Sequence, residues 1–199
     1  MTYLIIFLIL IFSIILHELA HAVVAKWNGD PTAERAGRLT LNPLPHIDWL
    51  GSVVLPLAFI FSGSGIFFAW AKPVPFDPAY FRHRAFGIFT VGVAGPLMNV
   101  ALAGFFALIL RSGGEGSVWK PFWYYGAYIN VLLAVFNLLP IPPLDGSRAV
   151  SVFLPKEAKK VYYSLDRWGL LILLILLYTG ALGTVIMPVQ TRLMQWLLG

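Results

Sequence analysis

Two histidines and a glutamate stand together in an apolar run near the N-terminus, in the order His17-Glu18-Leu19-Ala20-His21. On an α-helix, residues four apart lie about 40° from each other around the axis, so both imidazoles can reach one metal ion. The glutamate beside the first histidine can then hold and deprotonate the metal's water. This H-E-x-x-H spacing is typical of two zinc ligands and a general base.

A chance match to this short pattern is the alternative, with the three side chains forming a structural cluster. Here they interrupt a run of Leu, Ile, Phe, Val and Ala over residues 3–25. Each ionisable group in such a segment costs about 2.5 to 3.5 kcal/mol even on the mildest insertion scale. A bound metal offsets that cost, so the apolar surroundings favour a metal site over a structural cluster.

A further candidate ligand follows a proline-rich stretch at residues 140–144. Three prolines in four positions cannot continue a helix, so the chain leaves the preceding helix extended and presents Asp145 on a stiff arm. Asp-Gly is also an ordinary turn pair, so this aspartate could equally be a solvated loop residue. Catalytic zinc takes three protein ligands and keeps an open position for water. We therefore predict one zinc ion per chain, bound by His17, His21 and Asp145.

The composition is that of an integral membrane protein. Of the 199 residues, 59% are hydrophobic and 12% are charged, with a mean hydropathy of +0.79; a soluble domain has about 25% charged residues. The chain has no cysteine, which excludes disulfides and thiolate metal sites. His46, alone in a loop, is an ordinary hydrogen-bonding residue or, as the alternative, a ligand. A net charge of +5 without a basic tract does not indicate nucleic-acid binding.

Four segments are apolar and long enough to cross a bilayer, at residues 3–25, 85–110, 122–139 and 168–187. The expected fold is therefore all-α and integral to the membrane. We expect a single domain over residues 1–199, with its core in 1–150 and a C-terminal helical region in 151–199.

Three further segments complete the expected fold. Residues 50–71 have the length of a span, but Ser62 to Gly65 break them into pieces too short to cross singly, so we expect a re-entrant segment. Residues 37–42 alternate polar and apolar side chains and predict a short strand. The tail at 188–199 fits either an interfacial helix or a continuation of the last span.

The distribution of lysine and arginine supports the re-entrant segment. With it, eleven of the 14 cationic residues lie on one membrane face; with a full span the division is eight against six. The positive-inside rule then places the N-terminus outside and the metal site near the cytoplasmic face, in what we expect to be the cell membrane. The same topology puts the ends of the first and third spans on one face, as a metal shared by His21 and Asp145 requires.

Over about residues 1–150 the chain resembles the site-2 protease family of intramembrane zinc metalloproteases. The resemblance rests on the His17 to His21 motif, on Gly95-Pro96 with Asn99, and on residues 137–146. Alone, Gly95-Pro96 is equally explained by close helix packing and a kink. The resemblance implies that His17, His21 and Asp145 bind zinc and that Glu18 is the base. It also implies that Asn137 and Asn99 contact substrate, with Asn137 positioning the substrate or the developing oxyanion.

The resemblance further implies that residues 37–42 belong to a membrane-associated β segment, and that this is a minimal member without PDZ or CBS domains. We expect a zinc endopeptidase that cleaves a transmembrane protein near the cytoplasmic face, with that substrate and the lipid bilayer as its partners. The strand at 37–42 is a candidate for holding the unwound substrate by strand addition.

Two alternatives remain open. A divalent metal-ion transporter is disfavoured because the sequence has neither a second histidine-bearing span nor an evident repeat. An inactive substrate-binding relative is disfavoured because Glu18 is present.

Overall fold

The computed structural model describes residues 2–62, 70–113 and 118–199, and all the regular structure within them is helical. The longer helices form at the apolar runs of the sequence, as expected. In chain order the elements are α1 (Thr2–Trp27), α2 (Thr32–Arg35), the 3₁₀-helix η1 (Leu44–His46), the π-helix η2 (Trp49–Val54), α3 (Leu55–Ser62), α4 (Arg84–Ser112), α5 (Lys120–Asn137), α6 (Asp145–Ser151), α7 (Lys156–Ser164), the 3₁₀-helix η3 (Asp166–Trp168), α8 (Gly169–Tyr178) and α9 (Ala181–Leu198).

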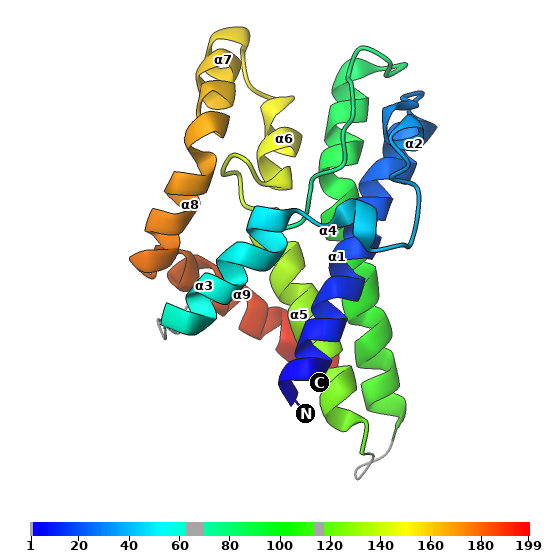
Figure 1. Cartoon of the computed structure of the whole chain (residues 1–199), viewed down its shortest axis with the longest axis vertical. Coiled ribbons are helices and arrows are strands. Elements are labelled where there is room, and N and C mark those ends of the chain that lie inside the picture. Colours follow the sequence, from blue (N-terminus) through cyan, green and yellow to red (C-terminus); the bar gives the residue numbers. More distant parts are fainter. Residues whose placement is uncertain (1, 63–69, 114–117) are drawn as a thin grey trace.

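Helix α4 is the centre of the molecule and packs along both α1 and α5 (Figure 1). It runs antiparallel to α1, and the Arg82 N–H, just before α4, donates to the Asn28 carbonyl, just after α1, at 3.0 Å. A small side chain allows this close approach, since Ala25 of α1 is fully buried and packs in one cluster with Val91 of α4. The segment that joins the two helices therefore starts and finishes at the same end of the molecule.

Three helices in the described part of the chain are long and apolar enough to cross a membrane: Leu4–Trp27, Arg84–Ser112 and Lys156–Tyr178. The predicted count of four is not confirmed. Helix α5 forms at the predicted third span, but its lysine, tyrosines and asparagines make it too polar to be among the three.

The predicted last span at 168–187 is wrong in its bounds. Gly180 has a φ of +75°, the left-handed conformation that glycine adopts readily, and it separates α8 from α9. The candidate span instead runs over Lys156–Tyr178, from α7 through η3 to α8, while α9 packs against α5 (Figure 1). Residues 188–198 continue α9, which contains Pro188.

The ends of the predicted re-entrant segment lie side by side. The Trp70 N–H donates to the Gly51 carbonyl at 3.2 Å, and the Lys72 N–H donates to the His46 carbonyl at 2.9 Å. The segment goes out through η2 and α3, and its residues 63–69 lie outside the described ones. Its return to the starting point is what the re-entrant prediction requires.

The predicted strand at residues 37–42 was wrong, because the structure has bends there and no paired strand. Arg38 is 4% exposed, and its guanidinium donates to the carbonyls of Pro45, Lys72 and Pro73, the last at 2.8 Å. This side chain ties the loop to both ends of the re-entrant segment, so the backbone folds compactly and leaves no extended edge. Substrate binding by strand addition at this segment loses its structural basis.

Candidate metal centre

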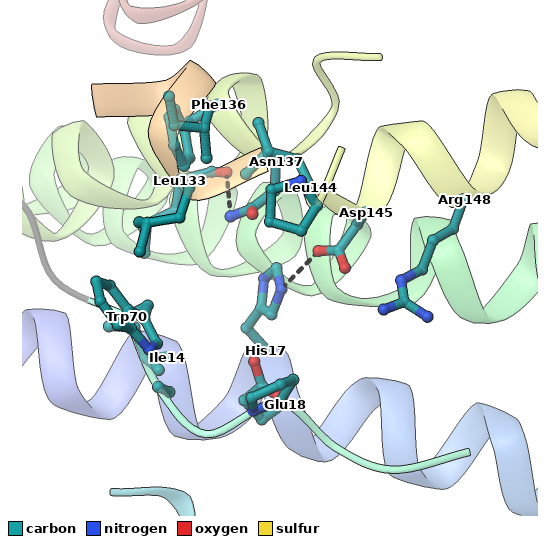
Figure 2. A pocket seen from close by; sticks show the side chains of 15 residues that line it. Ile14, His17, Glu18, Trp70, Leu133, Phe136, Asn137, Leu144, Asp145 and Arg148 are labelled. Atoms are coloured by element: carbon teal, nitrogen blue, oxygen red, sulfur yellow. Dashed lines mark hydrogen bonds and ion pairs between the residues drawn. The ribbon is translucent and has the colours of Figure 1, made fainter. Parts of the chain in front are cut away.

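One cavity collects most of the predicted site residues. Its volume is about 420 Å³. His17 and Glu18 line it from α1, Asn137 lines it from α5, and Asp145 lines it from α6 (Figure 2). The rest of its wall is mainly apolar and includes Ile14, Trp70, Leu133, Phe136, Leu170 and Leu173. We call it the main cavity; a small cavity of about 60 Å³ lies beyond Glu18 and is lined by His21, Phe76 and Arg148 among others.

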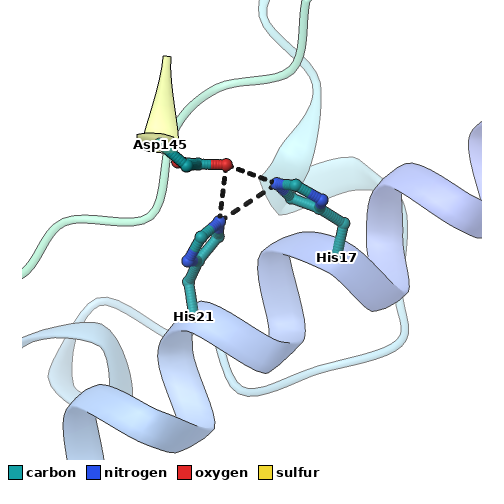
Figure 3. A group of neighbouring side chains, drawn as sticks. All are labelled: His17, His21 and Asp145. Atoms are coloured by element: carbon teal, nitrogen blue, oxygen red, sulfur yellow. Dashed lines mark hydrogen bonds and ion pairs between the residues drawn. The ribbon is translucent and has the colours of Figure 1, made fainter. Parts of the chain in front are cut away.

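The three predicted ligands converge on one point (Figure 3). Nε2 of His17 lies 3.0 Å from Nε2 of His21, and Oδ2 of Asp145 lies 3.0 and 3.2 Å from these two nitrogens. The histidines share one face of α1, and Asp145 is the first residue of α6. The fold therefore brings together side chains that are 128 positions apart in the sequence.

The other ring nitrogens fix the tautomers. Nδ1 of His21 is 2.7 Å from the Val91 carbonyl, which can only accept, so this nitrogen carries the hydrogen. Nδ1 of His17 donates in the same way to Oδ1 of Asn99 at 2.6 Å. Both Nε2 lone pairs and a carboxylate oxygen thus face one point. A metal ion at that point could bind all three atoms.

This donor set fits zinc. Ligand atoms about 2.0 to 2.2 Å from a tetrahedral zinc lie about 3.3 to 3.6 Å from one another, slightly further apart than the 3.0 to 3.2 Å observed. Oδ2 of Asp145 is the carboxylate oxygen that faces both Nε2 atoms, so the aspartate can supply the third ligand.

A buried chain of amides holds His17 in place. The Asn99 side chain donates from Nδ2 to Oδ1 of Asn130 at 2.9 Å, and Asn130 donates to Oγ of Ser13 at 2.8 Å. All three residues are 0% exposed and link α4, α5 and α1. Both the oxygen and the nitrogen of the Asn99 amide are hydrogen-bonded within the protein, and Asn99 does not line the main cavity. These contacts favour a role for Asn99 in orienting His17 over the predicted contact with substrate. Asn130 was missed, although a buried polar residue in an apolar helix is the signal that could have found it.

Gly95 has a specific reason to be glycine. A Cβ at this position would lie 2.4 Å from Nε2 of both His17 and His21. The open space beside the ligands therefore depends on the missing side chain of α4. Gly92, one turn earlier, lets α6 approach, because a Cβ there would lie 2.9 Å from the Ala149 nitrogen.

The predicted base is anchored from the other side. The Val74 N–H donates to Oε2 of Glu18 at 3.0 Å, and the carbonyl of the same Pro73–Val74 peptide accepts from Arg38 at 2.8 Å. The buried guanidinium of Arg38 thus fixes the Pro73–Val74 peptide, and this peptide in turn fixes the Glu18 carboxylate. Asn137 lines the main cavity, as predicted, and its Nδ2 donates to the Leu133 carbonyl at 3.0 Å. His46 is buried and its Nε2 donates to the Thr40 carbonyl at 3.1 Å, apart from the three ligands.

The chain is similar to known proteins along most of its length. A model described as peptidase family M50 matches residues 112–178. YwhC of Bacillus subtilis, named as a candidate zinc metalloprotease, is 36% identical over 94% of this chain and 85% of YwhC. Rip2 of Mycolicibacterium smegmatis, with the same designation, is 36% identical over 86% of this chain and 65% of Rip2. The zinc metalloprotease MJ0392 of Methanocaldococcus jannaschii is 25% identical over 77% of this chain and 35% of that relative. No solved structure matches the chain.

Proposed function

Because the chain belongs to peptidase family M50, the site-2 protease family of zinc metalloproteases, we propose that it cleaves a transmembrane protein substrate within the membrane. The observation that carries this proposal is the convergence of His17, His21 and Asp145 on one point, with Glu18 beside His17 in the wall of the main cavity. The apolar helix α1, which supplies three of these side chains, is long enough to cross a bilayer.

The residues divide the chemistry among them. His17, His21 and Asp145 would hold one zinc ion, which when bound polarises a peptide carbonyl and lowers the pKa of its water to about 7. Glu18 takes the proton from the attacking water and returns it to the leaving amine. Because the Val74 N–H holds Oε2 of Glu18, the other carboxylate oxygen is left to face the water.

The cavity walls fit an apolar peptide segment. A helical carbonyl is already hydrogen-bonded, so the substrate must unwind before its scissile bond reaches Glu18. Unwinding exposes backbone groups that need new partners in a water-poor site. Asn137 lines the main cavity, which supports a role in binding the substrate backbone or the developing oxyanion.

Cleavage of a membrane peptide tests the proposal. Purified protein in liposomes with a single-span peptide should cut it, lose activity when a chelator strips the metal, and regain activity when zinc is returned. Zinc content and peptide products are measured on the same samples. Liposomes that transport zinc across the bilayer without any peptide cleavage would instead support the transporter alternative.

We also propose that the N-terminus lies outside the cell membrane and the metal centre near its cytoplasmic face. Helices α2 and α7, with Arg35 and Lys156, lie at the same end of the molecule (Figure 1). Arg82, beside the start of α4, is joined to the end of α1 by a hydrogen bond. The cationic residues thus gather at the end of the molecule that the positive-inside rule assigns to the cytoplasm.

Single cysteines in this cysteine-free chain test the orientation. Arg35→Cys and Arg82→Cys, both at exposed positions, should resist a membrane-impermeant thiol reagent in intact cells and react after permeabilisation. Ser112→Cys is the matched control, because it is exposed at the far end of α4 and should react in intact cells. Labelling of Arg82→Cys in intact cells would contradict both the orientation and the re-entrant segment.

A further inference from the structure

Arg148 is a cation in the cavity wall. It follows Asp145 by three residues on α6 and lines both the main and the small cavity. Its guanidinium carbon lies 5.1 Å from the centre of the Phe76 ring, which holds the side chain in place. Across residues 2–62, 70–113 and 118–199, no carboxylate lies within ion-pair distance of it. Its N–H donors are therefore left to water or to a ligand.

The cavity is chemically asymmetric around the ligands. In Figure 2, Ile14, Trp70, Leu133 and Phe136 lie to one side of His17, and Arg148 lies on the opposite side, beyond Asp145. Ile14 is on the N-terminal side of the histidines along α1, whereas the small cavity shared by Arg148 adds His21 on the C-terminal side. A peptide lying across the site would place apolar residues at one end and meet a cation at the other.

We propose that Arg148 selects substrates with an aspartate or glutamate on the polar side of the scissile bond. This inference rests on the proposed function and names the class of peptide that the site takes. A peptide that fills the cavity removes water from the guanidinium, which must then find acceptors. A carboxylate supplies two oxygens in the planar geometry that arginine binds best.

The geometry limits where this acidic residue stands. Three helical residues separate Asp145 from Arg148, a rise of about 4.5 Å, and an extended peptide advances about 3.3 Å per residue. With the reach of the arginine side chain, the carboxylate falls within about three residues of the scissile bond. The proposal thus predicts a short-range charge preference and no preference for charges further along the substrate.

A peptide series in liposomes tests this selection. Single-span peptides carry Glu, Gln or Lys at the second and third residues on the polar side of the scissile bond and are otherwise identical. We expect the wild type to cleave the Glu peptide with a kcat/KM about tenfold above that of the Gln peptide, with the Lys peptide lowest. Arg148→Gln should remove the preference, and Arg148→Glu should favour the Lys peptide.

Controls separate selection from general electrostatics. Lys156→Glu makes the same charge change at an exposed position of α7 outside both cavities, so it should keep the preference for Glu. Zinc content is measured for each variant, so that loss of metal is recognised. If the wild type cleaves all three peptides alike, or Arg148→Gln slows all three equally, Arg148 only offsets the charge of Asp145 and Glu18, and the proposal fails. If the wild type cleaves none, the proposed function itself fails and this inference with it.

Discussion

Glu18→Gln should reduce peptide cleavage about a thousandfold while the purified protein keeps its zinc. The carboxamide has nearly the shape of the carboxylate, and its oxygen can still accept the Val74 N–H. It cannot take a proton from water at neutral pH, so only the base is lost. Because Glu18 is not among the three converging ligands, metal binding should be largely retained.

Glu34→Gln is the matched control for this substitution. Glu34 lies on α2 and forms an exposed ion pair with Lys26 at 2.7 Å. Exposed pairs contribute little, so both cleavage and zinc content should stay close to those of the wild type. Proteolysis that survives Glu18→Gln at the wild-type rate would remove Glu18 from the role of base.

Gly95→Ala should remove zinc and reduce cleavage at least about a hundredfold, although the change adds a single methyl group. The new Cβ would lie 2.4 Å from Nε2 of both His17 and His21, in the space their ligand atoms share. Alanine favours the helix more than glycine does, so the helical conformation of α4 should persist. The damage is therefore confined to the site, and zinc per chain by mass spectrometry measures it.

Gly104→Ala makes the same substitution on the same helix, at a position where a Cβ meets nothing within 4 Å. It should leave zinc and cleavage unchanged, and Asp145→Ala, which removes one of three ligands, gives the reference for zinc loss. Gly95→Ala protein that carries zinc at wild-type occupancy and cleaves at the wild-type rate would show that the ligands do not occupy this space.

The residues of the candidate site could be predicted because their signals lie in short stretches of sequence. The four-residue spacing of His17 and His21 fixes their common face on any α-helix, and the prolines before Asp145 end α5 on any fold. Apolar length likewise predicted the central helices. These signals depend only on the geometry of one helix or turn, so they do not depend on how the rest of the chain folds.

Elements that depend on a partner were predicted less well. The alternating pattern at 37–42 resembles a strand, but Arg38 binds carbonyls more than thirty residues away and bends the loop instead. In the last apolar stretch, hydropathy ran on past Gly180, whose left-handed conformation separates α8 from α9. In both cases a pattern taken over several residues hid the effect of one residue, Arg38 or Gly180, on the local backbone conformation.

Only the tertiary structure shows what surrounds the predicted residues. The contact between His17 and Asp145 spans 128 positions, and that between Glu18 and the Val74 N–H spans 56. Packing of α4 between α1 and α5 places Asn99 against His17 and assigns it to the buried amide chain. The sequence by itself determined which residues can hold a metal and move a proton, because residue type and helical spacing are local. The fold decided which of them meet and what holds them, because contacts between distant segments leave no periodic trace in the sequence.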